Sequence, residues 1–347
     1  MARKLVCLLT DRFYPEVINR QIADGFHNWP MAVVPIINTK DVDTADILII
    51  GAPYDRTASF RKGAAKGPDA IVDCLENQIE RYERFTGSVP VADCAIAYHC
   101  LSDLNRLMPE KMVARVASEY RKCLDRDQFI VLLGGEHSVS TGALQALASL
   151  RDPWSITVCQ IDAHLDLRHD DSDYRNVPHG TCAHCTVMRR AVELGFKTVQ
   201  VGVRAYSREE ISFAREHRLP FYEWTGDPAP DPAAIIESIA TDLVYLSIDV
   251  DGFDPAVMPA TGTPVPGGLE WFYGIGLIRE IFKRKTVIAA DIVEVAPRPF
   301  DVITEYGAAQ LCYSMIAFWE YYRRAAPEKM VASAPVWDED GGDRCDF

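Results

Sequence analysis

The sequence predicts an α/β domain built on a mainly parallel sheet, and two patterns along the chain carry that prediction. Short runs rich in Val, Ile and Leu recur, and most are continuous rather than alternating with polar residues. Continuous apolar runs are typical of strands that are covered on both faces. Segments with helical periodicity separate these runs. Strands that alternate with helices favour parallel pairing through right-handed crossovers.

The strands are expected where the apolar runs are short and rich in aliphatic residues. No internal repeat and no Gly/Ser-rich or Pro-rich linker interrupts their succession, so a single domain is the simplest interpretation. The predicted strands cover residues 5–9, 32–37, 46–53, 129–135, 155–162, 197–203, 242–249 and 286–295.

The helices are expected between these strands, and several carry start signals. Pro68 stands in a first turn, Ser207 and Glu210 have the spacing of a capping box, and Asp231 precedes Pro232 as an N-cap. Residues 306–322 are apolar nearly all round, which indicates a buried or interface helix. The predicted helices cover residues 67–82, 109–124, 207–217, 231–240 and 306–322.

The composition excludes several classes of partner. The net charge is -14 and no Lys/Arg block occurs, so nucleic acid is not an expected partner. No stretch is long and apolar enough for a membrane span, and the N-terminus lacks a signal-peptide pattern, which indicates a cytoplasmic protein. The 10 cysteines are scattered, as expected for free thiols in a reducing compartment. We interpret the single CxxC of Cys182 and Cys185 as coincidental.

Acidic side chains and histidines gather where three of the predicted strands end. Asp162, His164 and Asp166 alternate with apolar residues in QIDAHLD (160–166). In SIDVDGFDP (247–255), Asp249 and Asp251 alternate around Val250. Side chains two residues apart point to the same face of a strand, so these groups would lie close together. Carboxylates held that close repel one another unless a cation lies between them.

These residues predict a metal site with two divalent ions. A lone His137, after the strand at 129–135, is more often structural than a ligand, and a lone DxD is often a loop or a cap. Five ionisable groups at two further strand ends are too costly to bury without a partner. Carboxylates mixed with imidazoles suit borderline-hard ions such as Mn²⁺, and two such ions lower the pKa of a shared water. The candidate ligands are His137, Asp162, His164, Asp166, Asp249 and Asp251.

Taken in order, GGEHS (134–138), DAHLD (162–166) and SIDVDGFDP (247–255) resemble the arginase/agmatinase family of ureohydrolases. The resemblance extends from about residue 51 to the helix near 320. Three further segments share it: GAPYDRTASFRKGAAKGPDAI (51–71), PATGTPVPGGL (259–269) and DIVEVAP (291–297).

The resemblance implies a three-layer α-β-α fold and two Mn²⁺ ions per subunit, with Ni²⁺ or Co²⁺ as alternatives. His137 would bind one ion and His164 the other. Asp162 and Asp249 would bridge the two ions. Asp166 would join the ion of His137, and Asp251 the ion of His164.

The resemblance also implies a reaction, in which a bridging hydroxide attacks a guanidinium carbon and releases urea and an amine. Asp166 would hold the hydroxide, and Glu294 would accept guanidinium N–H donors. A loop histidine would carry the proton of the leaving amine. We favour His184 for its spacing to TVMRRA, with His179, which precedes a Gly, as the alternative. His169 is expected to face solvent.

We predict agmatine as the substrate, because the loop before this histidine is acidic. Asp170, Asp171 and Asp173 would disfavour a carboxylate and attract a second cation, and the alternative is that they only form a solvated loop. The alternatives are arginase activity on free or peptidyl arginine, and hydrolysis of a guanidino acid, guanidine or formiminoglutamate. Two other classes stay open: a metal-binding regulatory homologue, and a dimetal hydrolase of another bond, for which Arg168 is the one candidate phosphate contact.

The chain is expected to have three parts. Residues 1–45 form an N-terminal extension packed on the main domain, 46–330 form the ureohydrolase domain, and 331–347 form an acidic tail. The resemblance further implies a homo-oligomer, a trimer or a hexamer, that acts on a small cationic guanidino substrate without nucleic acid or membrane partners.

Overall fold

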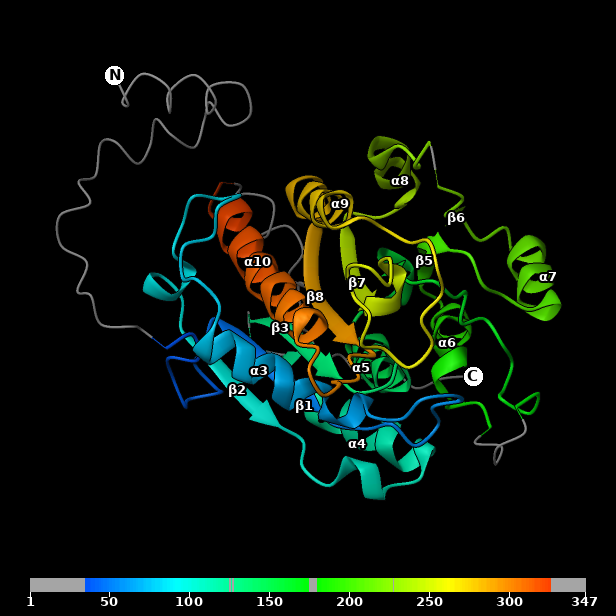
Figure 1. Ribbon diagram of the computed structural model, residues 1–347, viewed down its shortest axis with the longest axis horizontal. Coiled ribbons are helices and arrows are strands. Elements are labelled where there is room, and N and C mark those ends of the chain that lie inside the picture. Colours follow the sequence, from blue (N-terminus) through cyan, green and yellow to red (C-terminus); the bar gives the residue numbers. More distant parts are fainter. Residues whose placement is uncertain (1–34, 125, 127, 175–179, 227, 326–347) are drawn as a thin grey trace, which may run out of the picture.

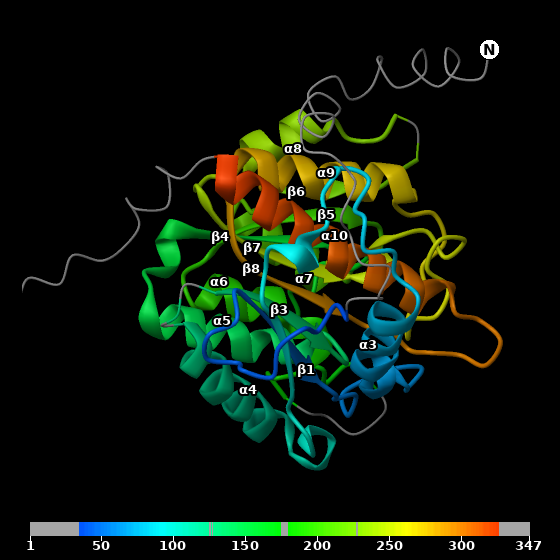
Figure 2. The same ribbon diagram turned by 90° about the vertical axis from the view of Figure 1, so that its left-hand side faces the viewer.

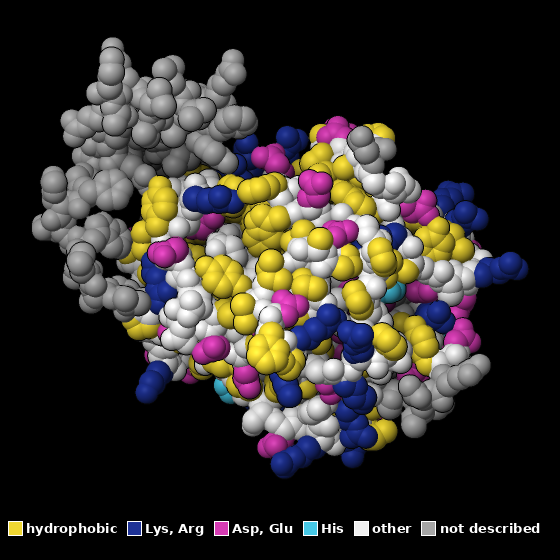
Figure 3. Space-filling view, viewed as in Figure 1, with side chains coloured by type: hydrophobic (Ala, Val, Ile, Leu, Met, Phe, Trp, Pro, Cys, Tyr) yellow, Lys and Arg dark blue, Asp and Glu magenta, His cyan; other side chains and the backbone are white. Residues whose placement is uncertain are grey.

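The computed structural model describes residues 35–325 except 125, 127, 175–179 and 227. The predicted strand at 5–9, most of the predicted N-terminal extension and the whole acidic tail lie outside the described residues. Among the described residues, no helix has both the length and the apolar character needed to cross a membrane. The face seen in Figure 3 mixes apolar, acidic and basic side chains.

Among the described residues, eight strands form one parallel sheet at the centre, in the order β2-β1-β3-β8-β7-β4-β5-β6. Figure 1 shows it with helices on both sides, which is the predicted three-layer α/β fold. The strands are β1 (Ile47–Ala52), β2 (Ile96–Cys100), β3 (Phe129–Gly134), β4 (Ile156–Ile161), β5 (Lys197–Val203), β6 (Phe221–Glu223), β7 (Leu243–Asp249) and β8 (Thr286–Val293).

The helices form two layers, which the two views of Figures 1 and 2 separate. One layer packs on the first face of the sheet and consists of α3 (Gly67–Asn77), α8 (Pro232–Ser238), α9 (Trp271–Arg284) and α10 (Ile303–Ala325). The other consists of α4 (Pro109–Leu124), α5 (Ser138–Leu150), α6 (Val187–Glu193) and α7 (Arg208–Glu216). Short 3₁₀ helices lie at Ala64–Lys66, Pro90–Ala92, Leu104–Arg106, Pro153–Ser155, His184–Thr186 and Val250–Gly252.

Strand β1 shows why the apolar runs are continuous. Ile47 and Ile49 pack in the core beneath α3 and α10, whereas Leu48 and Ile50 pack in the core beneath α4 and α5. Successive side chains point to opposite faces, so a strand between two helical layers needs apolar residues at every position.

Six of the eight predicted strands are confirmed. The strand at 5–9 lies outside the described residues, and the strand at 32–37 is wrong in its described part. Residues 35–37, the described part of the run at 32–37, are irregular. Ile36 is fully buried there, so the apolar signal reports burial. The backbone N–H of Ile37 donates to the carboxylate of Glu76 instead of to a neighbouring strand. The edge strands β2 and β6 were not predicted.

The helix start signals hold in detail, although the bounds of α3, α8 and α10 differ from the predicted ones. Ser207 and Glu210 form a reciprocal capping box at α7, and the Asp231 side chain caps α8. Helix α3 ends at Asn77 rather than residue 82. The Arg81 guanidinium donates to the carbonyls of Glu76 and Ile79, which satisfies acceptors at the end of that helix. Helix α10 is buried, as its composition predicts.

Candidate metal centre

The candidate ligands come from the carboxyl ends of neighbouring strands in the middle of the sheet. Strands β3, β8, β7 and β4 follow one another in the sheet, and all are parallel. His137 follows β3, Glu294 follows β8, Asp249 ends β7, and Asp162 follows β4. The carboxyl ends of parallel strands meet at one edge of a sheet, where ligands bind in α/β proteins.

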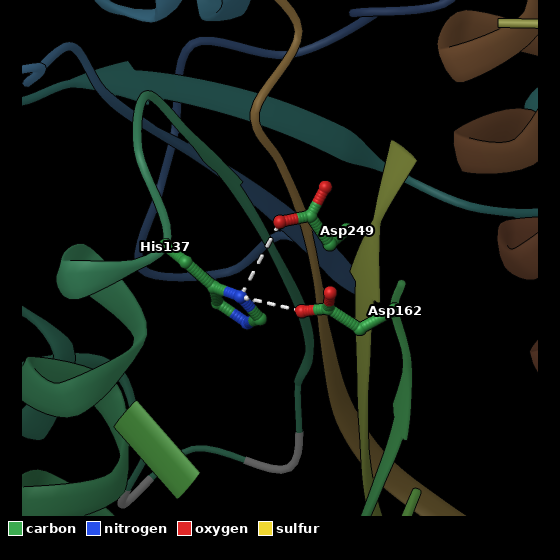
Figure 4. Close-up of side chains that lie close together, drawn as sticks. All are labelled: His137, Asp162 and Asp249. Carbon is green, nitrogen blue, oxygen red and sulfur yellow. Dashed lines mark ion pairs between the residues drawn. The ribbon is translucent and has the colours of Figure 1, made fainter. Parts of the chain in front are cut away.

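One group of candidate ligands surrounds His137. Its Nδ1 lies 3.2 Å from Asp162 Oδ2, 3.0 Å from Asp166 Oδ2 and 3.5 Å from Asp249 Oδ2. Figure 4 shows the side chains of Asp162 and Asp249 turned toward this ring. His137, Asp162 and Asp249 are all buried, and one ligand atom from each lies within 4.8 Å of the others.

A second group surrounds His164 and shares Asp162 with the first. His164 Nδ1 lies 3.4 Å from Asp162 Oδ1 and 3.2 Å from Asp251 Oδ2. The two oxygens of Asp162 therefore face different histidines, as a carboxylate that bridges two ions would. Asp249 faces only the His137 group by these distances.

Hydrogen bonds fix the carboxylates in these directions. Asp162 Oδ2 accepts from Gln160 Nε2 at 2.6 Å, and Asp162 Oδ1 accepts from the His164 backbone N–H at 2.6 Å. Asp249 Oδ1 accepts from the N–H of Asp251 at 2.9 Å. Bonds of this kind hold a carboxylate at a strand end before any ion binds.

The protonation of the His137 ring follows from its neighbours. Ser247 Oγ donates its one proton to Asp291 Oδ1 at 2.8 Å, so at 2.9 Å it can only accept from His137 Nε2. Without an ion, burial lowers the pKa of His137, but the three carboxylates around Nδ1 outweigh it and hold this pKa well above its usual range. In the neutral ring that metal binding requires, the lone pair of Nδ1 faces these carboxylates, and this atom has no hydrogen-bond partner. A lone pair buried among carboxylate oxygens is the arrangement of a metal ligand.

Sequence reasoning missed Ser247, Asp291 and Gln160. Each is a polar residue within a mostly apolar strand, and each is at most 2 % exposed. A polar side chain in a strand covered on both faces needs a buried partner. That requirement is the signal that could have found them.

The electrostatics of the group favour a bound cation. Burial raises the pKa of Asp166 to about 7, and the charge of Asp162 adds to this effect. Burial, together with the charges of Asp251 and Asp162, holds the pKa of Asp249 well above its usual range. Burial alone would raise the pKa of Asp162, but the adjacent imidazoles outweigh it and hold this pKa below its usual range. Carboxylates this crowded ionise together only when positive charge lies among them.

The residues present therefore fit two divalent ions, one for each histidine. The predicted ligands converge, and Asp166 joins them through its contact with His137. Asp166 has φ 51°, a left-handed backbone that is rare for a residue with a Cβ. Such strain, of order 1–3 kcal/mol, persists where the surrounding structure and the function of a site demand it.

Glu294 lies beside this centre on the next strand end. Its Oε1 accepts from the backbone N–H of His137 at 2.8 Å, and its φ is 65°. Burial raises its pKa well above the usual range, and the charge of Glu136 adds to this. Glu294 lines the same cavity as the two histidines, so a cationic group in that cavity would meet its carboxylate.

The loop histidines fall in different places. His184 is the first residue of the 3₁₀ helix His184–Thr186 and lines the cavity. His179 lies outside the described residues. His169 is exposed, as predicted. The ring of Tyr174 stacks on that of His184 with centroids 5.9 Å apart.

The cavity above the centre measures about 230 Å³, which suits a small ligand. Asp170, Asp171 and Asp173 do not line it, contrary to the role expected from the sequence. Local bonds occupy them: Asp171 accepts from Gly180 N–H, Asp170 from Ser172 N–H, and Asp173 pairs with Arg168 at 2.8 Å. The outer wall is made of Ser59, Arg168, Tyr174, Tyr206, Glu210 and Thr263.

The comparison with known families agrees with this geometry. The model of the Arginase family matches residues 45–317. The chain belongs to the arginase family. This membership confirms the predicted family and fold, and with them the prediction of a hydrolase of guanidino compounds.

Individual relatives cover most of the chain. It is 38 % identical to an N(1)-aminopropylagmatine ureohydrolase of Synechocystis sp., over 79 % of this chain and 89 % of that protein. It is 33 % identical to an agmatinase of Pyrococcus horikoshii, over 80 % and 93 %. The crystal structure of agmatine ureohydrolase of Thermoplasma volcanium superposes with a TM-score of 0.71 at 28 % identity, over 88 % of this chain and 99 % of that one.

Proposed function

We propose that this arginase-family member hydrolyses the guanidino C–N bond of agmatine, or of a close cationic relative, to urea and an amine. The observation that carries the proposal is the shared carboxylate of Asp162, whose two oxygens face His137 and His164 beneath a small cavity. The names of the related ureohydrolases support the cationic substrate.

His137 and Asp166 would hold one ion and His164 and Asp251 the other, and Asp162 and Asp249 would be shared between them. The mixed set of imidazole and carboxylate ligands favours Mn²⁺, with Ni²⁺ or Co²⁺ as alternatives. Two such ions, when bound, supply the positive charge that makes water a nucleophile near neutral pH.

The remaining residues bind and orient the reactants. The Glu294 carboxylate accepts guanidinium N–H donors and turns the guanidinium carbon toward the strand ends. Asp166 holds the attacking water by a hydrogen bond. His184 carries a proton to the leaving nitrogen, which otherwise departs as a strongly basic amide anion. His179 keeps its place as the alternative proton carrier.

The outer wall favours a cationic tail. Glu210 lines the cavity and is 4 % exposed, so a buried carboxylate faces the part of the substrate beyond the guanidinium. Arg168 also lines the cavity, but Asp173 at 2.8 Å and Glu210 at 3.7 Å offset its charge. The balance of charge on this wall suits an ammonium better than a carboxylate.

Arg168 nevertheless supports a second candidate, a guanidino acid such as guanidinobutyrate. A guanidinium is the natural partner of a carboxylate tail. The variant Arg168→Gln distinguishes the two candidate substrates. If the native substrate has a cationic tail, the variant should have a lower KM for agmatine and an unchanged KM for guanidinobutyrate. A carboxylate-tailed substrate would instead lose affinity about tenfold or more.

We further propose that the protein works in the cytoplasm as a homo-oligomer, a trimer or a hexamer, on a small molecule. Residues 46–330 would form the ureohydrolase domain, 1–45 an extension packed on it, and 331–347 an acidic tail. The acidic composition and the scattered cysteines support this location.

The test is urea release by Mn²⁺-loaded protein across a substrate panel. The panel holds agmatine, aminopropylagmatine, arginine, guanidinobutyrate, guanidine and an arginine-containing peptide. We expect the highest kcat/KM for agmatine or aminopropylagmatine. Urea from none of them, in protein that binds two metal ions per chain, would overturn the proposal.

A further inference from the structure

Thr57 touches His184 at two atoms, although 127 residues separate them in the chain. Its Oγ1 lies 3.0 Å from the backbone nitrogen of His184 and 3.3 Å from the ring Nδ1. Thr57 is 3 % exposed, in the loop that follows β1. One buried hydroxyl therefore holds both the backbone and the ring of the loop histidine.

The same hydroxyl also contacts Glu136. Thr57 Oγ1 lies 2.5 Å from Glu136 Oε1, and Ser138 Oγ lies 2.7 Å from that same oxygen. Two hydroxyls that meet one carboxyl oxygen both donate to it. This holds whether Glu136 is ionised or carries a proton on Oε2, because Oε1 is an acceptor in either case.

The number of protons available then determines which nitrogen of the His184 ring is protonated. A threonine hydroxyl has one proton, and here it goes to Glu136. Its oxygen can only accept from its remaining neighbours, the backbone N–H and Nδ1 of His184. We propose that Thr57 is a positioning residue that holds His184 with its proton on Nδ1 and the lone pair of Nε2 toward the cavity.

Two observations support this arrangement independently of the hydrogen bonds. The Tyr174 ring stacks on the His184 ring with planes 20° apart, which restricts rotation of the imidazole. Burial lowers the pKa of His184 to about 3, so its ring is neutral near pH 7. A neutral ring has one proton to place, so its position is a real choice between two nitrogens.

The inference rests on the proposed function and deepens it, because it sets the order of proton transfers. Nε2 first accepts a proton from water as the water oxygen bonds to the guanidinium carbon. Nε2 then returns that proton to the leaving nitrogen as the C–N bond breaks and its electron pair goes to nitrogen. The urea fragment passes its remaining hydroxyl proton to the free amine, so the products are urea and an ammonium ion.

The test compares Thr57→Val, which has the same shape without the hydroxyl, with Thr57→Ser, which keeps the hydroxyl. We expect Thr57→Val to lower kcat for urea release about tenfold to a hundredfold, with KM changed less than about threefold. Thr57→Ser should stay within about threefold of wild type. Thr198→Val, at a buried threonine on β5 whose hydroxyl has no hydrogen-bond partner, controls for the loss of a buried hydroxyl.

Equal kcat for Thr57→Val and wild type would overturn the inference, as would equal losses in the Val and Ser variants. A readout without turnover comes from ¹⁵N-histidine-labelled protein loaded with diamagnetic Zn²⁺, in which the His184 signals are identified by their loss in His184→Ala. Wild type and Thr57→Ser should carry the ring proton on Nδ1, and a proton on Nε2 would contradict the inference. This readout decides the matter even where no substrate yields urea, which would count against the proposed function alone.

Discussion

The strand ends and the loop that follows Asp166 build opposite walls of one cavity, and the chain holds them by different means. At the strand ends, backbone N–H groups and a buried amide fix the carboxylates of Asp162, Asp249 and Asp251, as Gln160 and the His164 N–H do for Asp162. In the loop, side chains hold one another: Arg168 lies over the Tyr174 ring and pairs with Asp173, whose side chain is 70 % exposed.

This difference separates two properties of the proposed enzyme. The rigid strand ends would determine which bond is broken, because they fix the ions, Glu294 and the guanidinium carbon in one place. The loop would determine which tail is accepted, because its contacts are exposed and can change without disturbing the centre. Substitutions should therefore be severe at the strand ends and mild in the loop outside His184, the proposed proton carrier.

The largest effect is expected for Asp162→Asn. This change removes the shared carboxylate that faces both histidines, so it should lower urea release by at least about a thousandfold and reduce the bound metal below two ions per chain. Metal analysis and urea assays measure both. The matched change Asp173→Asn in the loop should alter kcat/KM less than about threefold. More than a tenth of wild-type activity in Asp162→Asn would refute the shared-ligand assignment.

Glu294→Gln should come next. The amide keeps the shape but loses the charge that pairs with a guanidinium, so kcat/KM should fall about tenfold to a hundredfold. The metal content should stay at two ions per chain, since Glu294 faces the cavity beside the ligands rather than among them. Loss of metal together with activity would move Glu294 into the metal centre and remove its proposed contact with substrate.

Metal affinity should depend on pH with a definite sign. Burial raises the pKa of Asp166 to about 7, so metal-free protein carries a proton there at lower pH, and an ion must displace it. Affinity should weaken about tenfold for each pH unit below about 7. Titration calorimetry in buffers of different ionisation enthalpy should detect proton release at pH 6. A dissociation constant that stays level between pH 5.5 and 7.5 would contradict this electrostatic account.

The mildest effect is expected for Tyr174→Ala in the loop. Loss of an aromatic ring that lines the cavity should raise KM for agmatine about threefold to tenfold and change kcat less, because Thr57 still holds His184. Steady-state kinetics with agmatine and aminopropylagmatine would show whether the two substrates respond differently. A loss of kcat as large as that of Glu294→Gln would contradict the assignment of bond cleavage to the strand ends and of substrate choice to the loop.

The strand ends were also the more predictable region. Asp162, His164 and Asp166 alternate along one strand end, and period-two spacing places them together without any knowledge of tertiary structure. The parallel sheet then brings Asp249 and His137 to the same edge. The left-handed backbones of Asp166 and Glu294 could not be predicted, because nothing local favours such a conformation for these residues.

The loop was less predictable for a physical reason. Asp170, Asp171 and Asp173 read as an acidic lining, yet short-range bonds to Ser172 N–H, Gly180 N–H and Arg168 occupy them. Short polar side chains compete for nearby backbone groups, and the outcome depends on the fold of the loop. Glu210, which does line the cavity, lies outside this loop in helix α7. The sequence identified it only as part of a capping box.

We propose that hydrolysis of a guanidino compound depends on two ions at the strand ends. The most direct test adds Mn²⁺ stepwise to metal-free protein and follows urea release from agmatine. We expect little urea without metal, and a rate of urea release that rises to its maximum at two equivalents of Mn²⁺ per chain. Full activity in the metal-free protein, or a maximum at one equivalent, would contradict it.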